Sequence, residues 1–159
     1  MAVLNGWRAA LLSLVVLALS GTARADNESL EYAVKAAYVF KFTPFITWPT
    51  TTFPPAGSPI NLCVSGNDEV AKLLPQVAVG QLVDGRPFLV RPLADGADPQ
   101  GCQILYVANS PSAPQTLSAA LGKPVLTVMD AGAAVHSIVQ FVIVQHHIRF
   151  DIDNGMATQ

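Results

Sequence analysis

The sequence has 159 residues, of which 13% are charged, and a formal net charge of −2, a size that fits one domain. It contains no run or stripe of Lys and Arg, which argues against nucleic acid as a partner. The charged share is about half that of an ordinary globular domain, which indicates a well-buried domain or a surface covered by a partner.

The N-terminus has the pattern of an export signal. The apolar run Ala9–Ser20 follows an arginine and is too short to span a bilayer, and Ala23–Ala25 forms a small-x-small cleavage site. We therefore predict that residues 1–25 are a signal peptide cleaved after Ala25, and that residues 26–159 form one periplasmic domain. An uncleaved anchor is the alternative. The mature chain would carry seven basic and eleven acidic residues, a net charge of −4.

The first element predicted in the mature chain is a helix over Ser29–Phe42. Its apolar residues recur at three- and four-residue spacing, and Ser29 is a candidate N-cap. Pro44 should end or kink this helix one or two residues before it and open a further short turn. The proline-rich segment Pro49–Pro59 has the composition of a loop.

The remaining sequence alternates between strand and helix patterns. Two helices are predicted, Asn67–Val77, capped by Asn67 and shortened by Pro75, and Ser112–Gly122. Strands are predicted over Ile60–Gly66, Pro87–Arg91 (after a turn at Asp84–Gly85), Cys102–Ser110, Lys123–Asp130, 138–145 and 148–153. This alternation predicts the α/β class, with a mixed, mostly parallel sheet flanked by helices and an antiparallel C-terminal hairpin.

The two cysteines, Cys63 and Cys102, would meet an oxidising compartment after export, where an even pair usually forms a disulfide. A bridge closing so long a loop should stabilise the fold by roughly 4 kcal/mol. Two separate buried thiols are the alternative. If Cys63 lies late in one strand and Cys102 at the start of a parallel neighbour, they are too far apart to bridge. A bridge then requires shifted strand boundaries or one cysteine in a loop.

No motif for catalysis, for a metal or for a cofactor is present, and we predict none of the three. The histidines, His136, His146 and His147, stand at no diagnostic spacing from carboxylates or thiols. Asp151 and Asp153 should share one face of a strand, which is better explained as a solvated face than as an acid–base pair.

A candidate ligand crevice lies where two predicted strands end. Ligands of open α/β sheets bind outside the carboxyl ends of the strands. The candidate residues are Ser65, Asn67, Asp68, Asn109 and Ser110. Ordinary strand-to-helix turns are the alternative.

The segment Tyr38–Pro49 holds five aromatic residues and two prolines. On a continuous helix Tyr38, Phe42 and Phe45 would share one face, with Phe40 and Trp48 pointing elsewhere. Core burial is the simplest role for most of these rings, but aromatic residues also form the hot spots of interfaces. We predict that some rings seal the sheet and that the others serve dimer or partner contacts, and all five rings are candidates for that partner or dimer surface.

The stretch AAYVFKFTPFITWP resembles the first helix of the YfiR-like family of exported bacterial proteins, in which a helix rich in Phe and Tyr runs into a Trp-Pro pair. Four further blocks agree in order and spacing: INLCVSGND, VDGRPFLVRPLADGADPQGCQILYVANS, PVLTVMD and IRFDID. The resemblance covers about Leu30–Asp153. It implies an α/β fold, a homodimer, a disulfide between Cys63 and Cys102, and no enzymatic activity.

The resemblance also implies a function and partners. The protein would be a periplasmic repressor that binds the periplasmic part of an inner-membrane diguanylate cyclase and so lowers cyclic di-GMP signalling and biofilm formation. An outer-membrane, peptidoglycan-binding lipoprotein would relieve this repression by sequestering it. A periplasmic small-ligand-binding module without a cyclase partner is the alternative.

The sequence departs from the family pattern in several places. Pro44 stands where the family helix usually continues, Ser137–Ile138 stands near a usual Gly-Gly, and a second cysteine pair found in some members is absent. The sequence also stops at Gln159, where the family usually continues into a closing helix. We therefore expect that helix to be missing and one face of the sheet to lie bare.

Overall fold

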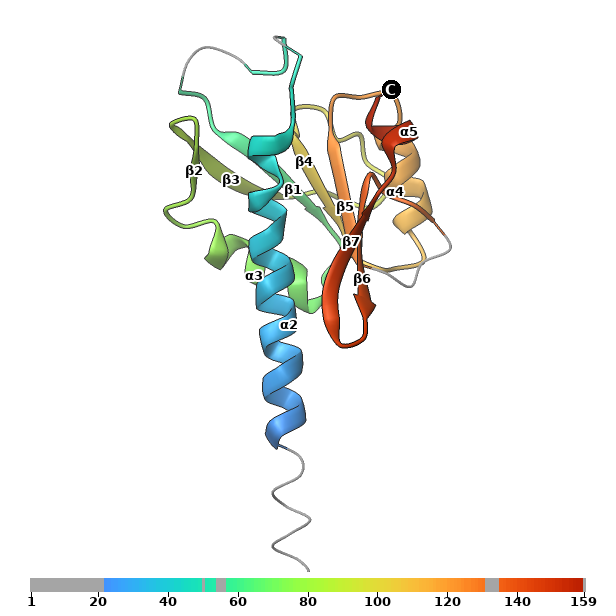
Figure 1. Cartoon of the computed structure of the whole chain (residues 1–159). Coiled ribbons are helices and arrows are strands. Elements are labelled where there is room, and N and C mark those ends of the chain that lie inside the picture. The colour runs from blue at the N-terminus through green and yellow to red at the C-terminus, as the bar shows by residue number, and fades with distance from the viewer. Residues whose placement is uncertain (1–21, 50, 54–56, 131–134, 159) are drawn as a thin grey trace, which may run out of the picture.

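The computed structural model describes residues 22–49, 51–53, 57–130 and 135–158. Within them the chain forms a seven-stranded sheet in the order β2-β3-β1-β4-β5-β6-β7 (Figure 1). The strands are β1 (Ile60–Ser65), β2 (Leu82–Val83), β3 (Arg86–Pro92), β4 (Ile104–Val107), β5 (Leu126–Asp130), β6 (Val139–Val144) and β7 (His147–Ile152). The pairs from β3 to β6 are parallel, whereas β2–β3 and β6–β7 are antiparallel. The predicted mixed, mostly parallel sheet with a C-terminal hairpin is confirmed.

Helices cover both faces of the sheet. Side chains of β4 alternate between two cores, because successive residues of a strand point to opposite faces. Ile104 and Tyr106 join the larger core under α2 (Thr22–Lys41) and α3 (Glu69–Val77). Leu105 and Val107 join a smaller core under α4 (Ala113–Ala120). Figure 1 shows α2 crossing the sheet on the face opposite α4.

The first helix begins earlier than predicted. It starts at Thr22 rather than at Ser29, so the predicted cap at Ser29 is wrong. Residues 22–28 contain no Gly or Pro that would stop a helix. The predicted cleavage site after Ala25 falls in the first turns of α2, and residues 1–21 of the predicted signal peptide lie outside the described residues.

The helix ends one residue before the predicted end at Phe42, and the further turn that was predicted at Pro44 is present. The α-helix stops at Lys41, and a 3₁₀ turn, η1 (Thr43–Phe45), follows with Pro44 near its start. Because Pro has no backbone N–H, it fits the first turn of a helix but not its continuation.

Two details of α3 differ from the prediction. Asp68 rather than Asn67 caps the helix, since its Oδ1 accepts a hydrogen bond of 2.7 Å from the Ala71 N–H. Pro75 does not shorten the helix, which continues to Val77. Pro75 stands near the C-terminal end, where losing one backbone hydrogen bond matters less than burial of the apolar face.

The chain after β7 forms a short helix, α5 (Asn154–Ala157), which the sequence analysis did not predict. Asp153 caps it by accepting a hydrogen bond of 3.0 Å from the Met156 N–H. Strand β7 therefore ends at Ile152, and the predicted pairing of Asp151 with Asp153 on one strand face is wrong.

Two turns of two residues close the hairpins. Asp84–Gly85 joins β2 to β3, and Gln145–His146 joins β6 to β7. All four residues have positive φ, between 50° and 73°, as type I′ turns require. His146 therefore lies in a turn while His147 opens β7, so their side chains are not neighbours on one strand face.

Cys63 and Cys102 form a disulfide, with their Cα atoms 5.8 Å apart. Cys63 lies in β1, and Cys102 lies in the loop just before β4. A strand-to-loop bridge is the arrangement that removes the geometric conflict between two parallel strands. Both side chains are buried in the smaller core beside Leu105 and Leu117, so the bridge ties the start of β4 to the centre of the sheet.

We expect the double substitution of Cys63 and Cys102 by Ala to lower the free energy of unfolding by about 4 kcal/mol, because the unfolded chain regains the freedom of a long loop. Urea denaturation of oxidised protein measures this difference. Wild-type protein treated with dithiothreitol serves as the control and should unfold at the midpoint of the variant. Equal midpoints for the variant and oxidised wild type would contradict the prediction.

Candidate functional site

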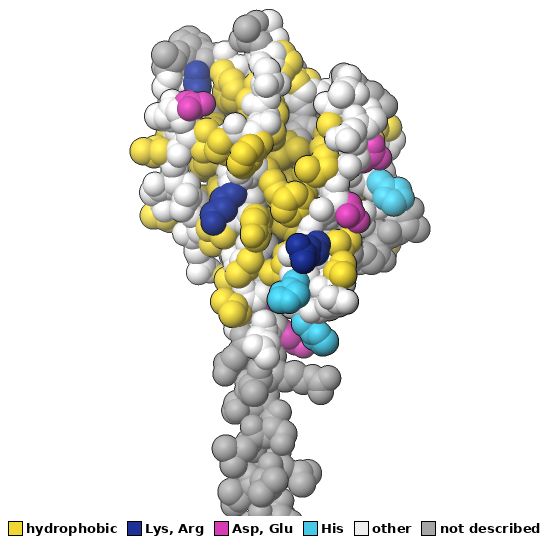
Figure 2. Space-filling view, viewed as in Figure 1, with side chains coloured by type: hydrophobic (Ala, Val, Ile, Leu, Met, Phe, Trp, Pro, Cys, Tyr) yellow, Lys and Arg dark blue, Asp and Glu magenta, His cyan; other side chains and the backbone are white. Residues whose placement is uncertain are grey.

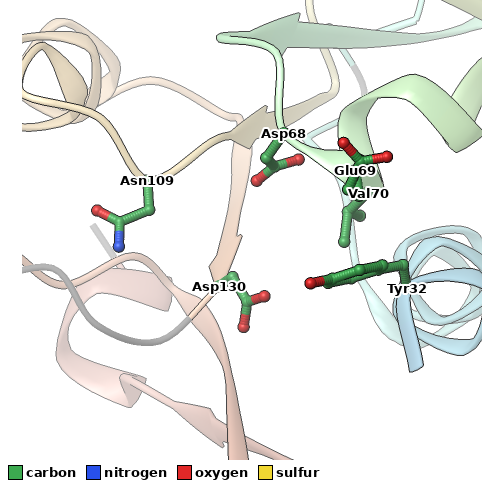
Figure 3. A pocket seen from close by; sticks show the side chains of 6 residues that line it. All are labelled: Tyr32, Asp68, Glu69, Val70, Asn109 and Asp130. Carbon is green, nitrogen blue, oxygen red and sulfur yellow. The ribbon is translucent and has the colours of Figure 1, made fainter. Parts of the chain in front are cut away.

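A hollow of about 350 Å³ opens beside the carboxyl ends of three parallel strands (Figure 3). Asp68 follows β1, Asn109 follows β4 and Asp130 ends β5. Figure 3 shows Tyr32 reaching from α2 toward Asp130 across the hollow. The lining residues are Tyr32, Asp68, Glu69, Val70, Asn109 and Asp130.

The order of the strands explains why a hollow forms here. From β1 the chain passes through α3 to β3 on one side, whereas β4 lies on the other side of β1 and leads through α4 to β5. The two connections leave the sheet toward opposite faces, since α3 and α4 belong to different cores. A crevice opens between such diverging connections, and it is the usual ligand position in open α/β sheets.

Two of the five predicted crevice residues, Asp68 and Asn109, line the hollow. The other three do not. Asn67 is exposed and outside the lining, Ser65 is buried under α4, and the Ser110 hydroxyl lies 2.9 Å from that of Ser112.

Four residues that line the hollow were not predicted from the sequence: Tyr32, Glu69, Val70 and Asp130. Asp130 carried a usable signal, because it is the last residue of the predicted strand Lys123–Asp130. Tyr32 carried none, since α2 brings it to the hollow from a distant part of the sequence.

The ammonium group of Lys35 holds α2 to the end of β5. Its side chain is only 3% exposed, and Nζ lies 2.7 Å from Asp130 Oδ2 and 2.6 Å from Glu31 Oε1. Burial lowers the pKa of Lys35, but the hydrogen bonds and charges of Asp130 and Glu31 outweigh burial, so the pKa lies above its ordinary value of 10.5. Lys35 is thus charged at neutral pH and neutralises part of the acidic lining.

Asp68 is held by two hydrogen bonds and so has a structural role. Besides capping α3, it accepts a bond of 2.8 Å from the hydroxyl of Tyr106, whose side chain is fully buried. Burial raises the pKa of Tyr106 far above its ordinary value, and the charge of Asp68 and the hydrogen bond to it act in the same direction. Tyr106 therefore remains a hydrogen-bond donor to Asp68 under ordinary conditions.

A second polar cluster lies at the opposite face, between the β3–β4 loop and α4. Asp95 accepts hydrogen bonds of 2.6 Å from the Ser112 hydroxyl and 2.8 Å from the Ser65 hydroxyl, and these bonds lower the pKa of its carboxyl. The Thr116 hydroxyl accepts a further bond from the Gly96 N–H. These contacts fasten the loop to the start of α4, which explains Ser65 at the end of β1 and Ser112 after β4 without a ligand.

The side chains that line the hollow offer binding groups. They comprise three carboxylates, one amide, one phenol and one apolar group, with no Ser, Cys or His among them. The described part of the chain holds no group of three or more His, Cys, Asp or Glu that could bind a metal ion. It also holds no helix with the length and apolar character that crossing a membrane requires.

The aromatic segment after residue 37 divides between core and surface. Phe40 and Phe42 are buried, with ring centroids 4.8 Å from Phe88 and 5.0 Å from Phe150 respectively. These two rings belong to the core in this structure and not to the exposed surface that we proposed for partner contacts. Figure 2 shows apolar side chains gathered over the α2 face.

The other three rings of this segment are accessible to different degrees. Tyr38 and Trp48 are half-buried, and Phe45 is 87% exposed. Because the α-helix ends at Lys41, Phe45 does not continue the face of Tyr38 and Phe42. Phe45 is therefore the ring of this segment that is most open to a partner.

We expect Lys35→Met to lower the free energy of unfolding by about 2 kcal/mol at neutral pH, because it removes a buried ammonium that two carboxylates face. The raised pKa means that this stabilisation is complete below pH 10.5 and is lost only as the pH rises through the higher folded-state value. Lys72→Met is the matched control, because Lys72 and its partner Glu69 are half-exposed and such pairs contribute about 0.5 kcal/mol. Equal effects of the two substitutions in chemical denaturation would contradict this role of Lys35.

Comparison with known proteins identifies a family for this fold. A search of curated proteins gave no match. The sequence model of the YfiR/HmsC-like family matches residues 32–159, which include α2 from Tyr32 onward, all seven strands of the described sheet and every residue that lines the hollow. Because this match spans most of the sequence, the protein belongs to the YfiR/HmsC-like family.

Proposed function

We propose that this protein is a periplasmic regulator that binds the periplasmic part of an inner-membrane diguanylate cyclase and represses it, so that cyclic di-GMP signalling falls. The observation that carries this proposal is the family match over residues 32–159. Export would depend on the predicted signal peptide, residues 1–25. A homodimer, and relief of repression by an outer-membrane lipoprotein, belong to the same proposal.

The surface of the molecule supports a role in protein binding. Phe45 is 87% exposed within the aromatic segment, beside the half-buried Trp48 and Tyr38. Large aromatic side chains contribute disproportionately to the affinity of protein interfaces. The lining of the hollow, by contrast, contains no nucleophile with an adjacent base, which favours a binding role over catalysis.

Repression across the membrane needs only a difference in affinity. If the protein binds one conformation of the cyclase's periplasmic domain more tightly than the other, it shifts the cyclase toward that conformation. The coupling is reciprocal, so a cyclase held in its active state should bind the repressor more weakly.

The first test is affinity capture of the exported protein from detergent-solubilised membranes, followed by mass spectrometry. We expect recovery of a membrane protein that carries a diguanylate cyclase domain, and a fall in cellular cyclic di-GMP when the protein is overproduced. Folded protein that captures no cyclase and leaves cyclic di-GMP unchanged would contradict the proposal.

We expect Phe45→Ser to weaken capture of the cyclase about tenfold, because truncating an aromatic anchor removes much of its contact area. Folding should be unaffected, since the side chain is almost fully exposed. Val79→Ser is the matched control, because Val79 is 79% exposed, follows α3 and lies outside the aromatic segment. Equal capture by both variants would remove Phe45 from the interface.

The hollow favours a second function, that of a small-ligand-binding module. It lies where α/β proteins place ligands, and its carboxylates outnumber its cationic neighbours, which suits a small organic cation. We expect such a ligand to raise the melting temperature of the wild type but not of Asn109→Leu, whose exposed side chain should leave folding intact. A flat thermal-shift screen over amines and amino acids would count against this function.

A further inference from the structure

Strand β7 leaves one edge of the sheet open. It is the last strand in the sheet order, and among the described residues no strand pairs with its outer side. Its apolar side chains are only partly covered, with Phe150 42% exposed and Ile152 51% exposed. An edge of this length with exposed apolar side chains readily pairs with another strand.

The hairpin geometry shows which backbone groups of β7 face outward. The residues beside a two-residue turn form a hydrogen-bonded pair, so His147 bonds to β6 and every second residue after it does the same. The bond of 2.9 Å from the Asp153 N–H to the Ile138 carbonyl continues this alternation. The backbone N–H and C=O groups of Ile148, Phe150 and Ile152 therefore point away from β6, toward the open edge.

The side chains of β7 divide in the same way. Phe150 packs against Tyr38 of α2 and against Phe42, which follows that helix, with ring centroids 6.2 Å and 5.0 Å away. Ile148 and Ile152 share this face, because side chains alternate along a strand. Arg149 and Asp151 lie on the opposite face, and both are exposed. The residues opposite them on β6 are the uncharged Val142 and Gln140, so the hairpin itself gives neither charge a partner across the strands.

We propose that β7 pairs antiparallel with β7 of a second copy of this chain, in the register centred on Phe150, and so joins two sheets into one across a twofold axis. In this register Phe150 faces its own symmetry mate and Ile148 faces Ile152 of the other copy. Arg149 faces Asp151, and the symmetry forms this ion pair twice. The outward backbone groups of both strands also meet, so the hydrogen-bond ladder is complete.

Other registers fail on charge or on backbone pairing. Centring on Arg149 or on Asp151 places that residue opposite an identical charge. Centring on Ile148 brings only residues 147–149 of the two strands opposite each other and leaves Arg149 without an acidic partner. Centring on Ile152 places Asp151 opposite Asp153. Registers centred between residues pair outward backbone groups with inward ones and break the ladder. The strand HIRFDI is therefore self-complementary in one register, and this identifies the occupant of the edge as a second copy.

The β7 pairing rests on the proposed function, because it locates the dimer that belongs to that proposal. Its test does not depend on the cyclase. The full chain is expressed with its own N-terminus, purified from the periplasm and studied by size exclusion with light scattering. Wild-type protein should be a dimer. Arg149→Asp and Asp151→Arg should each raise the dimer dissociation constant about tenfold or more, because both ion pairs become like-charge pairs. Lys72→Asp, a charge reversal on α3, is the control and should leave the dimer unchanged.

Mixing provides the decisive result. Arg149→Asp and Asp151→Arg chains should each dimerise poorly alone and form a heterodimer when mixed, because every cross-strand pair is then attractive. The Arg149→Asp/Asp151→Arg double variant should recover its own dimer. A monomeric wild type, single variants that dimerise like wild type, or a mixture that fails to recover the dimer would each overturn the proposal.

A second measurement tests the register independently of the charges. With both native cysteines bridged, Phe150→Cys should cross-link two copies on mild oxidation, since its symmetry mate lies directly opposite. Ile148→Cys should not, because its mate is displaced along the strand. Preferential cross-linking of Ile148→Cys would exclude the register.

The dimer and the proposed function can be tested separately. Cyclase capture by a monomeric Arg149→Asp variant would leave the proposed function standing. A normal dimer that captures no cyclase would reject that function alone.

Discussion

Burial of α2 on the sheet is the constraint on which the rest of the structure depends. This helix contributes Phe40 to the larger core, Tyr32 to the hollow and Tyr38 to the contact with β7, and the turn that follows it adds Phe42 to the core. Its apolar stripe alone would allow small shifts along the sheet, since apolar contacts are not directional. The buried ammonium of Lys35 makes the position more specific, because a shift of α2 along the sheet would separate Lys35 from Asp130.

The hollow therefore has a structural explanation as well as a functional one. Asp130 binds Lys35, Asp68 accepts a hydrogen bond from the Tyr106 hydroxyl, and Glu69 pairs with Lys72, so all three of its carboxylates are already engaged within the protein. Such groups hold α2, α3 and the sheet together whether or not a ligand binds. Asn109 lies on the β4–α4 connection and contributes a polar side chain to the lining from that side. A ligand that contacted both Asn109 and Asp68 would bridge the crevice between the ends of β1 and β4.

The sequence predicted the helices and strands better than it predicted which residues the fold brings together. Strand positions followed from short apolar runs between turn residues, and the end of α2 followed from the missing N–H of Pro44, because both signals are local. The start of α2 and α5 were missed, since neither Thr22–Glu28 nor Asn154–Ala157 carries a strong pattern. Tyr32 was missed as a lining residue because its place depends on how α2 crosses the sheet, which no local pattern contains. Phe40 and Phe42 were assigned to a possible surface for the same reason.

The two edges of the sheet explain why self-pairing would stop at two copies. At the far edge β2 has only two residues, and the neighbouring β3 carries Pro87 and Pro92, which cannot donate backbone hydrogen bonds. That edge is a poor template for a further strand. Strand β7 lacks proline and is long enough to pair. Because the twofold axis uses the same strand in both copies, the contact is closed and leaves no free β7 edge for a third chain. The apolar face that α2 leaves partly uncovered at Phe150 and Ile152 would then be covered by the same residues of the partner, without any further element of this chain.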